Sequence, residues 1–285
     1  MRIDSHQHFW RYRAADYPWM SDGMTVLKRD WLPRDLKPLL EQNRFDSCIA
    51  VQARTSEAET DFLLGLASEH PWIAAVIGWA DLTAEDLEVR LARWQERSKL
   101  AGFRHQVQDE TDAAAFLDAP PFLRGVARLQ AARRVYEVLV FSHQLDAASR
   151  FCARLDRHWL VLDHAGKPVI REGERYSWRV RLLPFRDMPH VLCKISGLVT
   201  EALRGDGTWD EAAIGRCLDV ALEIFGAERV MYGSDWPVCL LAASYDNVYR
   251  IIERWAARLS PSERENLFGA TAARCYGLKA VNRWT

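Results

Sequence analysis

Two histidines near the amino end of the chain are the first residues whose spacing could do chemistry. His6 and His8 lie two residues apart at the end of the segment that is predicted as the first β-strand. Alternate residues of a strand point to the same face, so both imidazoles are expected on one side of the sheet. Two converging imidazoles can hold one metal ion or polarise one carbonyl oxygen. A packed or surface histidine pair is the alternative that this spacing alone leaves open.

Two later apolar runs also end in ionisable side chains. Residues 159–162 run into His164 and a Gly-Lys-Pro break, and residues 229–233 run into Asp235, which a following Trp-Pro pair places in a turn. In α/β barrels the polar residues at the carboxyl ends of the strands do the chemistry. The candidate catalytic residues are therefore His6, His8, His164 and Asp235.

The order of the apolar runs predicts the fold that would position these residues. Strand patterns alternate with helical patterns from end to end, which is typical of a (β/α)8 TIM barrel, with a doubly wound open sheet as the alternative. A closing helical segment, 261–276, is expected on the outside of the barrel. No linker or repeat interrupts the pattern, so residues 1–285 are interpreted as a single domain. The expected strands are 2–5, 47–53, 73–80, 100–106, 135–141, 159–164, 191–196 and 229–233.

A long aromatic insert, residues 11–32, follows the first strand. A loop of this length in a compact domain is usually functional, so it is interpreted as a lid over the barrel mouth. A surface packing arm is the alternative.

The composition limits the class of partner. The chain has 49% hydrophobic and 27% charged residues, and its net charge of −1 provides no basic field for nucleic acid. No apolar stretch approaches the roughly 18 residues of a membrane span, and no signal peptide is evident. Six cysteines without paired spacing indicate reduced thiols. We therefore expect a cytoplasmic protein that has no nucleic-acid or membrane partner and whose oligomeric state the sequence leaves open.

Further side chains at the expected strand ends are candidates for binding substrate. Arg104 could hold a carboxylate through its planar guanidinium, or could form a surface ion pair. His105 alternates with Arg104, so only one of the two can face the barrel interior. Lys194, if it points inward, needs a charged partner such as Asp235. The other expected contacts are Gln52 and three tryptophans whose flat rings suit a sugar, Trp10, Trp79 and Trp236.

Three motifs together give the chain a family resemblance. His6-Gln7-His8-Phe9-Trp10, Asp163-His164-Ala165-Gly166-Lys167-Pro168 and Gly233-Ser234-Asp235-Trp236-Pro237 resemble the amidohydrolase superfamily. Within it, the chain is similar to the amidohydrolase-related branch of sugar lactonases, of the L-fuconolactonase and L-rhamnonolactonase type. This resemblance covers essentially the whole chain. It implies a distorted barrel and a hydrolase that opens a small-molecule sugar lactone to the sugar acid.

The resemblance also implies roles for the candidate residues. Asp235 would activate water, and His6, His8, Asp235 and His164 would be the ligands of a metal where one is present. The fourth strand lacks the bridging lysine or glutamate of many binuclear members, which indicates one divalent ion such as zinc, or metal-independent hydrolysis with histidine and arginine polarising the carbonyl. Two alternatives remain: a metal-dependent decarboxylase of an unsaturated or aromatic acid, and a catalytically silent sugar-binding barrel.

Overall fold

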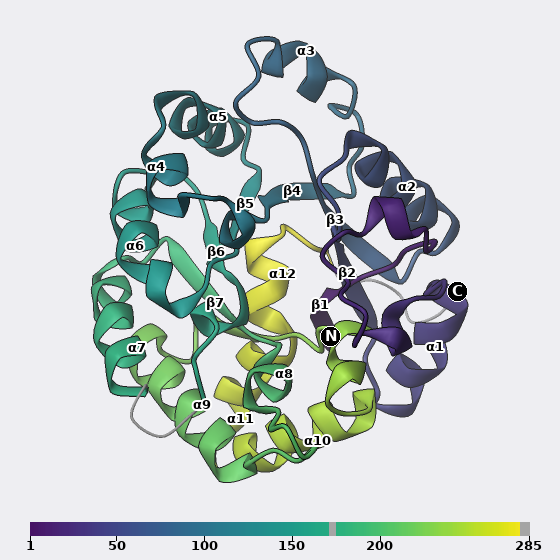
Figure 1. Ribbon diagram of the computed structural model, residues 1–285, viewed down its shortest axis with the longest axis vertical. Coiled ribbons are helices and arrows are strands. Elements are labelled where there is room, and N and C mark those ends of the chain that lie inside the picture. Colours follow the sequence, from purple (N-terminus) through teal and green to yellow (C-terminus); the bar gives the residue numbers. More distant parts are fainter. Residues whose placement is uncertain (171–174, 280–285) are drawn as a thin grey trace.

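Eight parallel strands, hydrogen-bonded in chain order, form the centre of the molecule (Figure 1). The computed structural model describes residues 1–170 and 175–279. All eight expected strands are present, and their sequential order confirms the barrel and excludes the doubly wound alternative, in which the strand order reverses. The strands are β1 (Ile3–Gln7), β2 (Ser47–Val51), β3 (Ile73–Gly78), β4 (Leu100–His105), β5 (Val135–Val138), β6 (Leu160–Leu162), β7 (Val191–Ile195) and β8 (Val230–Tyr232).

The barrel closes where its first and last strands meet. Gln7 and Trp236 form a parallel bridge. His8 N donates to Trp236 O at 2.7 Å, and Asp235 N donates to His6 O at 2.8 Å. The seam therefore passes directly through the candidate catalytic residues.

Helices surround the barrel, and side-chain oxygens start several of them. Ser56, Asp112, Asp210 and Ser244 each accept a backbone N–H of the helix that follows. No helix of the described residues has the length and hydropathy needed to cross a bilayer.

The α-helices are α1 (Pro33–Gln42), α2 (Glu57–Glu69), α3 (Leu87–Ala92), α4 (Ala113–Asp118), α5 (Pro120–Ala131), α6 (Leu145–Ala153), α7 (Arg175–Leu182), α8 (Leu198–Ala202), α9 (Glu211–Phe225), α10 (Tyr245–Ala256), α11 (Pro261–Glu265) and α12 (Thr271–Cys275). The 3-10 turns are η1 (Ala14–Asp16), η2 (Thr25–Leu27), η3 (Val107–Asp109), η4 (Ser142–Gln144), η5 (Asp163–Gly166), η6 (Leu183–Asp187) and η7 (Val238–Leu241), and η8 (Asn266–Ala270) is a π-helical turn.

The core has two parts because the strands are buried on both faces. The larger part lies between the strands and the surrounding helices. The smaller part joins inward side chains of the strands, among them Ile49, Val161 and Met231, to Cys275 and Tyr276 at the end of the chain's last helix. All six cysteines are buried.

The position of the closing helical segment corrects the expectation that it packs outside the barrel. Figure 1 shows α12 in the middle of the ring of helices. Ala272 and Cys275 pack against Ile3 and its inward neighbours in the smaller core. Inward strand residues at this end of the barrel are apolar, and covering them with an apolar helix removes them from water. α12 therefore forms the floor of the barrel, whereas Leu267 and Phe268, earlier in the segment, pack in the outer core as expected.

A bulge in β1 allows its inward residues to be both apolar and catalytic. Ile3 belongs to the barrel interior, and His6 lies three residues later, where simple alternation would turn it outward. Asp4 pairs with Cys48 and Gln7 pairs with Ala50, so over this interval β1 has one residue more than β2. This extra residue restores the inward direction of His6, as β-bulges do beside active sites.

Candidate active site

The candidate catalytic residues meet at the carboxyl end of the barrel. His8 Nε2 lies 3.3 Å from Asp235 Oδ1, and His6 Nε2 lies 3.8 Å from the same oxygen. The rings of His6 and His164 are 4.6 Å apart between centroids. All four side chains are buried. The structure thus brings together the four residues that the strand ends singled out.

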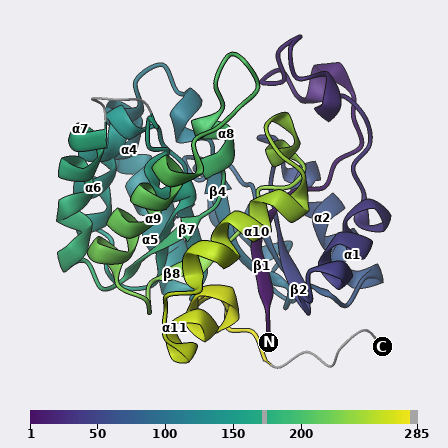
Figure 2. The ribbon, with the colours of Figure 1, turned by 90° about the horizontal axis from the view of Figure 1, so that it is seen from below.

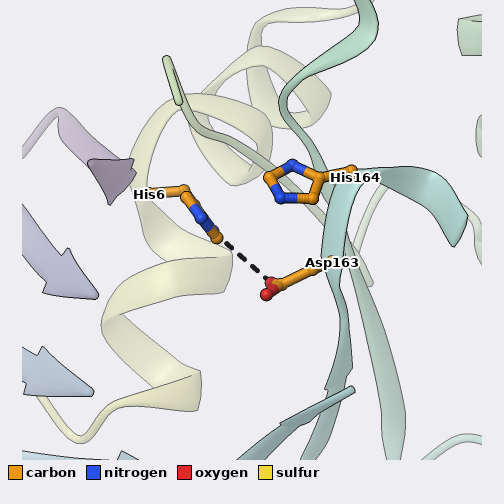
Figure 3. A group of neighbouring side chains, drawn as sticks. All are labelled: His6, Asp163 and His164. Atoms are coloured by element: carbon orange, nitrogen blue, oxygen red, sulfur yellow. Dashed lines mark ion pairs between the residues drawn. The ribbon is translucent and has the colours of Figure 1, made fainter. Parts of the chain in front are cut away.

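Contacts on the far side of each imidazole orient the first two histidines. His8 Nδ1 lies 2.8 Å from Val51 O, a carbonyl that can only accept, so Nδ1 carries the proton and Nε2 offers its lone pair to the site. His6 Nδ1 lies 3.4 Å from Asp163 Oδ1, a pair drawn in Figure 3, and 3.2 Å from Lys194 Nζ. His6 Nε2 lies 3.2 Å from Arg104 Nη1, which can only donate, so this nitrogen offers a lone pair. Both Nε2 atoms therefore face Asp235 as electron-pair donors.

His164 is presented by an unusual backbone turn. Its φ of 53° lies in the left-handed region, and Asp235 has a φ of 58°. Such conformations cost energy for residues with a Cβ and cluster at functional sites. His164 Nδ1 lies 2.9 Å from Ser196 Oγ. Gly197 leaves the room for this arrangement, because a Cβ there would lie 2.8 Å from His164 Nδ1.

Burial and neighbouring charges set the protonation of the site. Burial alone would raise the pKa of Asp235, but attraction to His164 and the close approach of His8 hold it well below its usual range. Burial lowers the pKa of His164 to about 4, although Asp235 opposes the shift. Burial and the charge of Lys194 lower the pKa of His6 as well. At neutral pH the site therefore holds an ionised aspartate beside neutral imidazoles at positions 6 and 164.

A buried ionic network lies next to the histidines. Arg104 Nη1 donates to Asp163 Oδ2 at 3.0 Å, and its Nε donates to Gln52 Oε1 at 3.0 Å. Lys194 Nζ donates to Glu137 Oε1 at 2.6 Å and lies 3.6 Å from Asp163 Oδ1. Lys194 therefore points inward as considered, but its charged partners are Glu137 and Asp163 rather than Asp235.

A cavity of about 360 Å³ opens above the candidate catalytic residues. His8, His164 and Asp235 line it together with Arg104. The remaining lining residues, from the 11–32 insert and from loops after the strands, are Trp19, Met24, Ala53, Gln106, Gln108, Asp109, Leu139, Phe141, Lys167, Thr200, Glu201, Val238 and Leu241. This mixture of apolar walls and a few convergent polar groups is typical of small-molecule sites.

Of the expected substrate-binding residues, Arg104 alone is among those that line the cavity. His105 points away from it, stacking on Phe116 and donating through Nε2 to Glu110 Oε1 at 2.6 Å. Trp79 Nε1 donates to His105 Nδ1 at 3.0 Å. The others are buried outside the lining: Trp10, Trp236, Gln52 and Lys194. The tryptophan that does line the cavity is Trp19.

Sequence reasoning missed several members of the site. Asp163 stands in one of the three motifs, but strand alternation predicts that its side chain points away from that of its neighbour His164. Glu137, Ser196 and Lys167 carried no separate signal. A charged residue inside the apolar run of β5 could have drawn attention to Glu137, since a buried charge requires a partner.

The donor set fits one divalent metal ion. His6 Nε2, His8 Nε2 and Asp235 Oδ1 all lie within 4.8 Å of one another, and imidazole nitrogen and carboxylate oxygen are ordinary zinc ligands. Asp235 Oδ1 is buried without a hydrogen-bond partner, and a bound metal ion would satisfy this oxygen instead. A second group, His6, Asp163 and His164, shares His6 with the first. Arg104 Nη1 competes for His6 Nε2 at 3.2 Å.

Comparisons with known proteins show what the chain is similar to. A family model described as Amidohydrolase matches residues 3–278. A curated L-fucono-1,5-lactonase of Burkholderia multivorans (strain ATCC 17616 / 249) is 57% identical over 286 residues, spanning 98% of this chain and 96% of the relative. A second, from Burkholderia ambifaria (strain ATCC BAA-244 / DSM 16087 / CCUG 44356 / LMG 19182 / AMMD), is 33% identical over 280 residues, spanning 96% and 95%.

A solved structure is similarly close. A crystal structure of an amidohydrolase from Burkholderia multivorans with bound zinc superposes with a TM-score of 0.94. Its sequence is 56% identical, and the match spans 98% of this chain and 100% of that chain.

Proposed function

This chain belongs to the amidohydrolase family, and from that premise we propose that it hydrolyses a sugar lactone, with L-fucono-1,5-lactone as the substrate to test first. The observation that carries the proposal is the buried group of His6, His8, His164 and Asp235 beside a cavity of about 360 Å³. Ester opening needs an oriented water, a proton acceptor and a polarised carbonyl, and this group offers all three.

We assign to Asp235 the role of accepting a proton from the attacking water. Its ionised carboxylate lines the cavity and has two oxygens, so Oδ1 can face a metal ion while the other oxygen accepts a proton from a water molecule. The water oxygen adds to the lactone carbonyl carbon, the bond from that carbon to the ring oxygen breaks, and the ring oxygen takes up the proton that Asp235 accepted from the water. The product is the open-chain hydroxy acid.

We assign to His164 the role of donating a hydrogen bond to the carbonyl oxygen of the lactone. If Ser196 donates its hydroxyl proton to Nδ1, at 2.9 Å, the neutral ring carries its remaining proton on Nε2. An N–H directed into the cavity can donate to the oxyanion that forms during attack.

One divalent metal ion is part of this proposal. His6, His8 and Asp235 would hold it, and when bound it would act as a Lewis acid on the lactone carbonyl. His8 is prepared for this role by the contact of its Nδ1 with Val51 O, and His6 by Asp163. Zinc is the ion to test, since the donors are nitrogen and oxygen.

The 11–32 insert is proposed as a lid. Trp19 and Met24 line the cavity, and Trp19 Nε1 donates to Ala53 O at 2.9 Å. Trp10 and Trp31 exchange backbone hydrogen bonds of 2.9 and 3.0 Å, which tie the two ends of the insert together. Figure 2 shows the insert on the same side of the barrel as α8, away from α11.

Both alternatives have less support than lactone hydrolysis. The two curated relatives at 57% and 33% identity are lactonases, which favours this reaction over decarboxylation. A silent sugar-binding barrel has no need for a buried aspartate among imidazoles, because burying that charge is costly.

The test is a panel of lactones and aromatic acids assayed by release of acid or of carbon dioxide. We expect acid release from L-fucono-1,5-lactone above the uncatalysed rate and no decarboxylation. Binding of sugars without turnover would favour the silent barrel, and release of carbon dioxide would favour the decarboxylase.

A further inference from the structure

We propose that Lys167, not Arg104, is the cation that binds the carboxylate formed when the lactone opens. The inference rests on the proposed lactonase function and names the side chain that distinguishes the charged product from the neutral substrate. A carboxylate released beside Asp235 adds a second negative charge to a buried site, and this requires a cation nearby.

Arg104 has no free donor for this purpose, although it lines the cavity. Its Nε donates to Gln52 Oε1 at 3.0 Å, and its Nη1 contacts Asp163 Oδ2 at 3.0 Å and His6 Nε2 at 3.2 Å. Its Nη2 donates to the backbone oxygen of Gln52 and to Gln52 Oε1. A guanidinium has five N–H groups: Gln52 and Asp163 take four of them, and the fifth faces His6 Nε2, the atom that would hold the metal. Arg104 is therefore a positioning residue that holds Asp163, His6 and Gln52.

Lys167 has the opposite surroundings. It lines the same cavity as His164 and Asp235, and its Nζ lies 5.0 Å from the ring centroid of Phe141, another cavity residue. No carboxylate of the described residues lies within ion-pair distance of this ammonium group. A cation held over an aromatic ring keeps its N–H donors available for an anion.

The backbone brings Lys167 to the cavity by the same turn that presents His164. Residues 164–167 have consecutive positive φ values of 53°, 50°, 68° and 49°. Lys167 N donates to His164 O at 2.9 Å, which closes the turn. Left-handed residues persist in series only where the surrounding structure holds them. One closed turn therefore carries both His164 and Lys167 to the cavity that they line together.

The other charged groups of the cavity make the role of Lys167 more specific. Glu201, Asp109 and Asp235 line the cavity, and Arg104 is the other cation there among the described residues. Burial raises the pKa of Glu201, and attraction to Lys167 partly offsets the rise, so the two side chains interact across the cavity without forming an ion pair. A product carboxylate would therefore meet one cation with open donors.

The experiment compares two ligands that differ only at the reacting carbon. L-Fuconate carries the carboxylate, and L-fucitol has a neutral hydroxymethyl group in its place. Titration calorimetry near neutral pH would measure the Kd of each for wild type, Lys167→Met, Lys167→Arg and Arg104→Met. Lys37→Met, at a partly exposed pair with Glu41 on α1, is the matched control outside the cavity. Circular dichroism checks that each variant folds.

We expect Lys167→Met to weaken L-fuconate binding by about tenfold or more, because a charge-assisted hydrogen bond is lost. L-Fucitol binding should change by less than about twofold, since no charge is involved. Lys167→Arg should keep most of the preference for L-fuconate.

An unchanged ratio of the two Kd values in Lys167→Met, measured in an enzyme whose wild type hydrolyses the lactone, overturns this inference and leaves the proposed function standing. A selective loss of L-fuconate binding in folded Arg104→Met, with none in Lys167→Met, returns the role to Arg104. A wild type that does not hydrolyse the lactone overturns the proposed function itself, and the product assignment with it.

Discussion

Lys194 Nζ lies 2.6 Å from Glu137 Oε1, and both side chains are fully buried inside the barrel. Tyr276 Oη, from the floor of the barrel, donates to the same carboxylate at 2.7 Å. On its other side Lys194 Nζ lies 3.2 Å from His6 Nδ1. The floor of the barrel is thus connected to the site by one chain of polar contacts.

Removing one partner of the Lys194–Glu137 ion pair should lower the free energy of unfolding more than replacing both partners with apolar residues. We expect Lys194→Met to lower the free energy of unfolding by about 3–5 kcal/mol, because Glu137 is left buried without its cation. The double variant Lys194→Met with Glu137→Leu should recover part of that loss. Urea unfolding of both single variants and the double variant measures the coupling. Strictly additive losses would show that the two charges do not stabilise each other.

Replacing Glu137 by the neutral residue glutamine should change how the free energy of unfolding depends on pH. Burial raises the pKa of Glu137 from 4.5 to about 7, although attraction to Lys194 opposes the rise. A raised pKa means that the folded state binds this proton more tightly than the unfolded chain does. The resulting stability is present below the unfolded pKa and is lost as pH rises through the folded pKa.

Between about pH 5 and pH 8, wild type should therefore lose roughly 2–3 kcal/mol of stability relative to Glu137→Gln. Chemical unfolding of both proteins across this range is the measurement. Parallel stability curves would show that Glu137 does not titrate with a raised pKa.

Asp235→Asn should preserve the fold and remove the proton acceptor. We expect a loss of about 100-fold or more in kcat on the lactone, because the isosteric amide cannot take up the proton of water. Initial rates measure the loss in kcat, and circular dichroism checks that the fold is preserved. Asp118→Asn, at an exposed pair with Arg154, is the control and should leave kcat unchanged. Near-normal turnover by folded Asp235→Asn would contradict the assigned role.

Metal binding should not exceed one equivalent. The two candidate ligand groups share His6, so they cannot both be filled independently. We expect zinc titration to saturate at or below about one ion per chain and His8→Ala to lose tight binding, since the group then has one ligand fewer. Elemental analysis after dialysis is the measurement. Two tightly held ions per chain would mean that the groups act as a binuclear site.

Shortening Trp19 should affect substrate capture more than chemistry. Its ring lines the cavity and its Nε1 anchors the insert to Ala53 O. We expect Trp19→Ala to raise KM about tenfold with a smaller change in kcat, because an aromatic wall is lost while the reacting groups stay in place. A fall in kcat at constant KM would place Trp19 in the chemistry instead.

The strand ends could be predicted from the sequence because periodicity and turn residues mark them. His164 and Asp235 each follow an apolar run, and those positions are the carboxyl ends of β6 and β8. Whether Arg104 or His105 faces inward could not be predicted, because alternation fixes opposite faces without saying which is which. Arg104 is inward, and Asp163 balances its charge.

Two other features depend on contacts that no local pattern contains. Asp163 reaches the site beside His164 because the left-handed turn breaks strand alternation. The apolar spacing of Ala272, Cys275 and Tyr276 fits burial against any apolar surface, and only the assembled ring shows that this surface is the barrel interior.

The seam between β1 and β8 has a consequence for how activity arises during folding. His6 and His8 come from the first strand and Asp235 from beyond the last, and the hydrogen bonds that join these segments are those that close the ring. A chain that has formed all but its final strand lacks the proton acceptor, however much secondary structure it contains. Recovery of turnover after denaturation therefore requires this seam to be closed, whereas recovery of helical signal does not.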